Sequence, residues 1–235
     1  MDMCISSRLR PVPALQLLAT SALGLYCAGA MAGGPPDIRP LLEAAPSVDF
    51  VYYKAPGMSV MTPAMTGGAN LVTAGTKSSQ LPEGGELERA FEIPNASSEI
   101  ATQLVARLKS GSFASKLHVE DHPHERPWST DPRAYHGETQ DPYVLELFVD
   151  GHGAAYMPFN WKTYYYGISA RLRLIDVAQA KVVWEHRCNQ SGLRGSTYKL
   201  KVDEFEANSG ARLKEVERAA NDFCAHELGD LLGAG

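Results

Sequence analysis

The chain has 235 residues and a formal net charge of −5, with 22 Lys and Arg against 27 Asp and Glu. Binding to nucleic acid needs a basic stripe, and this mildly acidic chain shows none, so no nucleic-acid partner is expected. The length suits one domain preceded by shorter non-domain segments.

The first 32 residues have the pattern of a secretory signal peptide. Arg8 and Arg10 form a positive n-region, residues 14–30 carry no charge and are rich in leucine, and Ala30-Met31-Ala32 offers small residues for cleavage. We therefore expect residues 1–32 to be removed and the mature protein to be periplasmic or associated with the outer membrane.

Cys27 raises the alternative of a lipoprotein. A lipidated cysteine normally follows a small residue and has an aliphatic residue three positions upstream, whereas Tyr26 and Gly24 occupy those positions here. Cleavage after Ala32 is therefore preferred to lipidation at Cys27 and to an uncleaved anchor.

Two segments of unusual composition follow the signal. Residues 33–47 are rich in Pro, Gly and Ala and predict a flexible tether, after which residues 48–235 are expected to form a single domain. No charged residue lies between Lys54 and Lys77, and the prolines and glycines there exclude a membrane-spanning helix. We expect a mobile, uncharged segment over residues 55–76, with a hairpin as the alternative, that meets a partner or a membrane.

The first half of the domain predicts three regular elements. Asp49 to Lys54 is rich in β-formers and predicts a strand, Ser97 to Ser110 has the apolar spacing of a helix, and Lys116 to Glu120 predicts a short strand. Residues 121–142 are polar and contain four prolines, so no core element is expected there.

The second half predicts an antiparallel meander and a final helix. Apolar and polar residues alternate over residues 143–150 and 166–174, and a short turn leads into a third strand, Lys181 to Cys188. Apolar residues recur every three or four positions from Ala211 to Leu228. The fold class is therefore α+β: a largely antiparallel sheet of four or five strands with two helices packed on one face.

Cys188 and Cys224 are the two cysteines that remain after the signal is removed. In an oxidising compartment two such cysteines favour a disulfide, with two unpaired buried thiols as the alternative. Cys188 ends the third meander strand and Cys224 lies on the apolar face of the last helix, so the two sulfurs meet if that helix packs on the side of the strand that carries Cys188.

The segment Tyr166–Cys188, YGISARLRLIDVAQAKVVWEHRC, resembles the strand–turn–strand of many uncharacterised bacterial envelope proteins and lipoproteins. More distantly, the order of elements over about residues 97–230 is similar to the N-terminal domain of TolB and to curli-secretion-type lipoproteins. The resemblance implies a fold and an envelope setting, with Asp176 forming the turn and Trp184 the core. It transfers no catalytic or ligand residue, and the missing lipobox departs from the lipoprotein members.

Histidines cluster in the polar stretch, at His118, His122, His124 and His136. Imidazoles at short spacing are zinc or copper ligands, but Pro123 interrupts the run and neither a cysteine ligand nor a His-Glu-x-x-His helix accompanies it. A solvated loop is preferred, and a metal or small-ligand site on this loop is the alternative. His152, between two glycines, is interpreted as part of a turn.

Aromatic residues gather where the first two meander strands connect. Consecutive Tyr164, Tyr165 and Tyr166 place rings on both faces of a sheet, so at least one ring faces away from the core. The predicted partner-contact residues are Tyr156, Phe159, Trp161, Tyr164 and Tyr165. The alternative is that other parts of the chain cover this second face.

The motifs all have structural explanations, and neither a Gly-x-Ser-x-Gly elbow nor another catalytic motif is present. We therefore expect a non-enzymatic, exported envelope protein without a cofactor. It would act through protein or envelope contacts, including peripheral membrane contact or self-association. The alternative function is a periplasmic protein that binds a metal or small ligand through the loop from His118 to His136.

Overall fold

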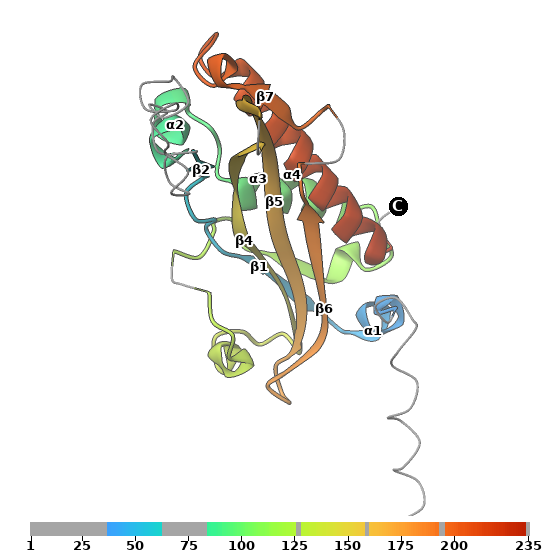
Figure 1. Ribbon diagram of the computed structural model, residues 1–235. Coiled ribbons are helices and arrows are strands. Elements are labelled where there is room, and N and C mark those ends of the chain that lie inside the picture. Colours follow the sequence, from blue (N-terminus) through green and yellow to red (C-terminus); the bar gives the residue numbers. More distant parts are fainter. Residues whose placement is uncertain (1–36, 63–83, 126–127, 158–159, 193–195, 234–235) are drawn as a thin grey trace, which may run out of the picture. The chain divides into compact units, whose positions relative to one another are not determined.

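The computed structural model describes residues 37–62, 84–125, 128–157, 160–192 and 196–233 (Figure 1). These residues belong to one compact unit that begins at Pro35. In chain order its elements are α1 (Arg39–Ala44), β1 (Val48–Tyr52), β2 (Ser59–Met61), α2 (Gly84–Phe91), α3 (Ala96–Leu108), η3 (Ala114–Lys116), β3 (Leu117–Val119), η4 (Pro132–Tyr135), β4 (Tyr143–Met157), β5 (Asn160–Asp176), β6 (Lys181–Gln190), β7 (Lys199–Lys201), η5 (Val202–Glu204) and α4 (Ala211–Leu231).

The strands form one mixed sheet in the order β3-β1-β4-β5-β6, with β2 also paired to β4 and β7 to β5. The predicted meander is confirmed, because β4, β5 and β6 are consecutive antiparallel neighbours. The predicted number of four or five strands is wrong, and so is the expectation that the strands outside the meander are largely antiparallel. The described residues form seven strands, and β1 is parallel to both β3 and β4 while β2 is parallel to β4.

Helices α3 and α4 pack against each other and cover one face of the sheet, called the inner face below (Figure 1). Their apolar stripes meet the inward residues of β4 and β5, including Leu145, Leu147 and Leu172, in the main hydrophobic core. Burial of this apolar area is the principal stabilisation of the fold. None of the described helices is both long and apolar enough to cross a membrane.

The outer face of the sheet is covered over the half that contains the start of β4 and the end of β5, called the lower half below (Figure 1). Here Val144, Phe148 and Ile175 form a second small core together with Tyr135 of η4. The ring of Trp128 stacks on Phe148 with centroids 3.8 Å apart. The proline-rich stretch that was expected to stay outside the core therefore contributes one buried and one partly buried aromatic ring, although it has no periodicity that predicts this.

Two segments that were predicted to be flexible contain regular structure. The predicted tether, residues 33–47, includes helix α1, whose Leu42 is completely buried in the main core. The predicted mobile segment, residues 55–76, includes β2, and Met58 and Val60 are buried there. Residues 33–36 and 63–76 lie outside the described residues.

A β-bulge in β4 decides which side chains face the helices. The register with β5 shifts between Val149 and Gly151, so Val149 and His152 both face inward although they are three positions apart. Gly153 follows with φ of +153°, and a Cβ on it would lie 2.0 Å from the carbonyl oxygen of Ser59. Strand β2 can therefore pair closely with β4 only because this position is glycine.

Candidate functional site

The predicted disulfide is present and joins β6 to α4. Cys188 and Cys224 are bonded, both are fully buried, and 36 positions separate them in the sequence. The helix packs on the side of the strand that carries Cys188, as the pairing required. The disulfide fixes the helix against the edge strand and offers no free thiol for chemistry.

The predicted histidine site does not assemble. His118 pairs with Asp141 at 2.7 Å, and His124 pairs with Glu120 at 2.7 Å. His122 and His136 are exposed. Among the described residues, the group of three or more close metal-ligating side chains is a different one, and it contains none of these four histidines. The described part of the loop provides separate histidine–carboxylate pairs and no common centre.

The aromatic segment divides between the two faces of the sheet. Tyr164 is fully buried on the inner face, where it meets Phe205 edge-to-face with centroids 5.0 Å apart, so it cannot contact a partner. Tyr156 and Tyr165 are half-buried. Phe159 and the side chain of Trp161 lie outside the described residues, and their predicted contacts stay predictions.

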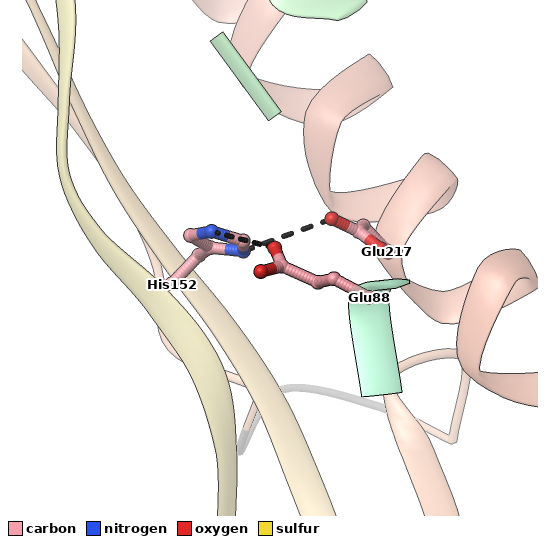
Figure 2. Close-up of side chains that lie close together, drawn as sticks. All are labelled: Glu88, His152 and Glu217. Carbon is pink, nitrogen blue, oxygen red and sulfur yellow. Dashed lines mark ion pairs between the residues drawn. The ribbon is translucent and has the colours of Figure 1, made fainter. Parts of the chain in front are cut away.

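A buried group of Glu88, His152 and Glu217 lies between the sheet and the helices; we call it the Glu–His–Glu cluster. The three side chains come from α2, β4 and α4, and one ligand atom of each lies within 4.8 Å of the others. Figure 2 shows both carboxylates pointing at the imidazole. His152 Nε2 is 3.5 Å from Glu88 Oε1, and His152 Nδ1 is 3.7 Å from Glu217 Oε1.

Backbone and tyrosine contacts fix the imidazole of His152. Its Nε2 donates to the carbonyl oxygen of Pro56 at 2.9 Å, because a carbonyl can only accept. In the neutral ring Nδ1 then accepts from the Tyr166 hydroxyl, which is 2.7 Å away. Asn95 bonds both backbone groups of Ala55 and so holds the neighbouring Pro56 in place. Burial lowers the pKa of His152, which keeps the ring neutral at neutral pH.

Glu217 is the most unusual member of the cluster. It is 1% exposed, and neither of its carboxylate oxygens has a hydrogen-bond partner of ordinary geometry. Burial, followed by the negative charges of Glu99 and Glu88, raises the pKa of Glu217 to about 8. The Tyr166 hydroxyl acts in the opposite direction, but its hydrogen bond of ordinary geometry goes to His152.

Glu88 is held more firmly than Glu217. Its Oε2 accepts a hydrogen bond from the backbone nitrogen of Met58 at 3.0 Å, which leaves Oε1 turned toward His152. Carboxylate and imidazole groups in such an arrangement either share protons or ligate a cation.

This cluster was not predicted from the sequence, although two of its members carried a signal. His152 was assigned to a turn, and strict alternation along β4 places it on the outer face; the flanking Gly151 and Gly153 are the signal of a bulge, because glycine inside a strand often marks one. Glu217 carried a usable signal. It lies four positions after Leu213 and is followed four positions later by Asn221, so two polar residues interrupt the apolar face of α4.

No family model matches the chain, and no curated protein matches its sequence. In structure it is similar to the PelC dodecamer from Paraburkholderia phytofirmans, at 14% identity over 85% of this chain and 94% of that chain, with a TM-score of 0.35. It is also similar to a Xanthomonas campestris protein of family DUF330, at 10% identity over 82% of this chain and 87% of that chain, with a TM-score of 0.40.

A third similar structure is a lipoprotein from Neisseria meningitidis, at 17% identity over 76% of this chain and 99% of that chain, with a TM-score of 0.25. The expected similarity to TolB and to curli-secretion lipoproteins stays a prediction. At these identities and TM-scores, the function has to be inferred from the residues of the chain itself.

Proposed function

We propose that this chain is an exported envelope protein that acts by binding a protein partner, including a second copy of itself, and not by catalysis. The proposed export rests on the signal-like residues 1–32 and on the disulfide, which suits an oxidising compartment. The proposed contact surface rests on the upper half of the outer face of the sheet.

A row of four residues crosses this upper half in register. Met61 of β2 pairs with Ala155 of β4, Ala155 with Tyr165 of β5, and Tyr165 with Lys199 of β7. We call these residues the Met61 row. Side chains at directly opposed positions share one face of a sheet, and the next row consists of Ser59, Gly153 and Gly167. The surface is therefore flat, with small residues beside a methionine and a tyrosine.

The exposure of Met61 is the observation that carries the proposal. Among the described residues, two large hydrophobic side chains are exposed: Met61 at 50% and Phe223 at 40%. Met61 is separated by Ala155 from the half-buried ring of Tyr165, and the Lys199 ammonium lies 5.2 Å from the centroid of that ring. Methionine and tyrosine are enriched at protein interfaces, and the lower half of the same face is already covered by the chain's own residues.

Catalysis is less well supported by the geometry. The side chains of His152 and Glu217 are 0% and 2% exposed, so the Glu–His–Glu cluster is nearly closed to a substrate. Open clefts with convergent polar groups are the usual setting of turnover. A buried cluster of this kind favours a structural or cation-binding role.

Cross-linking in intact cells tests the proposal. A photo-reactive residue at position 61 should give a defined protein adduct, whereas the same residue at position 223, the other exposed hydrophobic position, should give none. The mature protein recovered from these cells should begin near Gly33. Equal adducts from both positions, or none from position 61, would refute the contact surface, and an acylated terminus at Cys27 would refute the cleavage site.

A further inference from the structure

We propose that Glu88, His152 and Glu217 bind one divalent transition-metal ion, with zinc as the first choice. The proposal is independent of the Met61 row, because the cluster lies on the inner face under the helices and the row lies on the outer face. It rests on the donor set, on the missing partners of Glu217 and on an entry path.

The three side chains are of the kinds that ligate zinc, and they lie close together. Two carboxylates and one imidazole form a set that Zn²⁺ accepts, and in a tetrahedral zinc site neighbouring ligand atoms are about 3.3 Å apart. The two carboxylates lie near different nitrogens of the imidazole, since Nε2 is 3.5 Å from Glu88 Oε1 and Nδ1 is 3.7 Å from Glu217 Oε1. A single ion takes one of these nitrogens, and one ligand atom of each residue lies within 4.8 Å of the others, so the ligand atoms have to approach one another by up to about 1.5 Å. The flexible glutamate side chains can close the remaining distance to a single ion.

The two unpartnered oxygens of Glu217 point to a cation as the missing partner. A buried carboxylate without hydrogen bonds is costly, and both Glu217 oxygens lack them at 1% exposure. Within the described residues, neither Glu88 nor Glu217 forms an ion pair with a lysine or arginine. Glu99, which is held by Asn221 through a hydrogen bond of 2.7 Å, adds further negative charge nearby.

Two backbone groups, the Pro56 carbonyl and the Met58 nitrogen, orient two of the ligands, as metal ligands require. The hydrogen bond from His152 Nε2 to the Pro56 carbonyl fixes the ring and leaves the Nδ1 lone pair for a metal, once the Tyr166 hydroxyl turns away. Glu88 is oriented in the same way by the Met58 backbone nitrogen. These contacts hold two of the three ligands, His152 and Glu88, in position before any ion enters.

A cavity gives an ion a route from solvent. It has a volume of about 220 Å³, and its lining includes Glu99 and Glu217 but neither Glu88 nor His152, so an ion would meet Glu217 first. Its complete lining is Glu92, Ile93, Pro94, Glu99, Lys214, Glu217 and Arg218. A route of this kind is one of the requirements for a metal site that fills after folding.

Zinc binding by the mature, chelator-treated protein tests the inference. Calorimetry with zinc chloride should give one site per chain in the wild type, and zinc should raise its melting temperature. Glu217→Gln and His152→Gln should each lower the affinity by more than about tenfold, because loss of a ligand exceeds the effect of losing a second-shell group. His118→Gln, at the exposed pair with Asp141, is the matched control and should bind zinc as the wild type does.

Three results would overturn the inference. They are no saturable binding of zinc or manganese by the wild type, unchanged affinity in Glu217→Gln, and loss of binding in the His118→Gln control. If His152→Gln fails to fold, as judged by circular dichroism, the wild type and Glu217→Gln decide the question, since the glutamine substitution keeps the size and shape of the side chain.

Discussion

Two buried glutamates on opposite faces of the sheet differ in whether a neighbouring positive charge compensates the carboxylate. Glu146, on the outer face, is 0% exposed and accepts a hydrogen bond of 2.9 Å from the guanidinium of Arg173. Glu217, on the inner face, has no such partner. Burial raises the pKa of both carboxyl groups, but Arg173 lowers that of Glu146, whereas Glu99 and Glu88 raise that of Glu217 further.

The difference separates a structural ion pair from a candidate binding site. Glu146 and Arg173 neutralise each other beneath Trp128, and the Arg173 guanidinium lies 4.5 Å from the centroid of the Trp128 ring. The charge of Glu146 is therefore compensated within the chain through Oε2, although its Oε1 has no hydrogen-bond partner of ordinary geometry. The Glu–His–Glu cluster leaves a buried carboxylate uncompensated, and such groups are often found where a protein binds an ion or handles a proton.

The largest loss of stability is expected from breaking the buried ion pair between Glu146 and Arg173. Arg173→Met should lower the free energy of unfolding by about 3 to 5 kcal/mol, because it leaves Glu146 buried without a counter-charge. Urea denaturation measures this loss. The control is Arg187→Met, whose half-exposed ion pair with Asp150 should contribute about 1 kcal/mol or less. Equal losses in the two variants would contradict the view that Glu146 depends on Arg173.

A somewhat smaller loss of stability is expected from removing the disulfide, which fixes the helix that carries Glu217. Cys188→Ser should lower the free energy of unfolding by about 2 to 4 kcal/mol, because the closed loop of 36 positions restricts the unfolded chain. Reduction of the wild type should give the same loss in the same denaturation experiment. Two reactive thiols in freshly isolated, unfolded and non-reduced protein would show that the bond is not formed.

Parts of the fold with a local pattern were predictable. The meander and α4 follow from alternation and helical spacing, and the cysteine pair follows from its count and its faces. The parallel pairing of β1 and β2 with β4 joins segments about 90 positions apart, and no local pattern encodes it. Helix α1 has too few residues for its pattern to stand out against the surrounding prolines.

The candidate site was only partly accessible to sequence reasoning. Glu217 and Asn221 on an otherwise apolar helix face were a signal, because buried polar residues in such a position need partners. His152 became a neighbour of Glu217 through a one-residue bulge, and a bulge reverses which side chains of a strand point inward. The aromatic run predicted rings on both faces correctly in principle, but Tyr164 was assigned to the wrong face.

Comparison of Glu146→Gln with Glu217→Gln tests the central claim, that one buried glutamate is matched and the other is not. In chelator-treated protein at about pH 8, Glu146→Gln should destabilise the fold because Arg173 loses its counter-charge. Glu217→Gln should stabilise it. Because the pKa of Glu217 is raised in the folded state to about 8, the folded protein holds a proton that the unfolded chain releases. The contribution of Glu217 to wild-type stability therefore falls as pH rises through this range.

The gain from Glu217→Gln should grow by up to about 1.4 kcal/mol per pH unit between about pH 5 and about pH 8, since a difference of one bound proton corresponds to about 1.4 kcal/mol per pH unit. Added zinc should reverse the order at pH 8, by stabilising the wild type and leaving Glu217→Gln unchanged. The account predicts opposite signs for the two substitutions in chelator and a zinc response in the wild type and Glu146→Gln alone. Equal destabilisation by both substitutions, at every pH and with or without zinc, would contradict it.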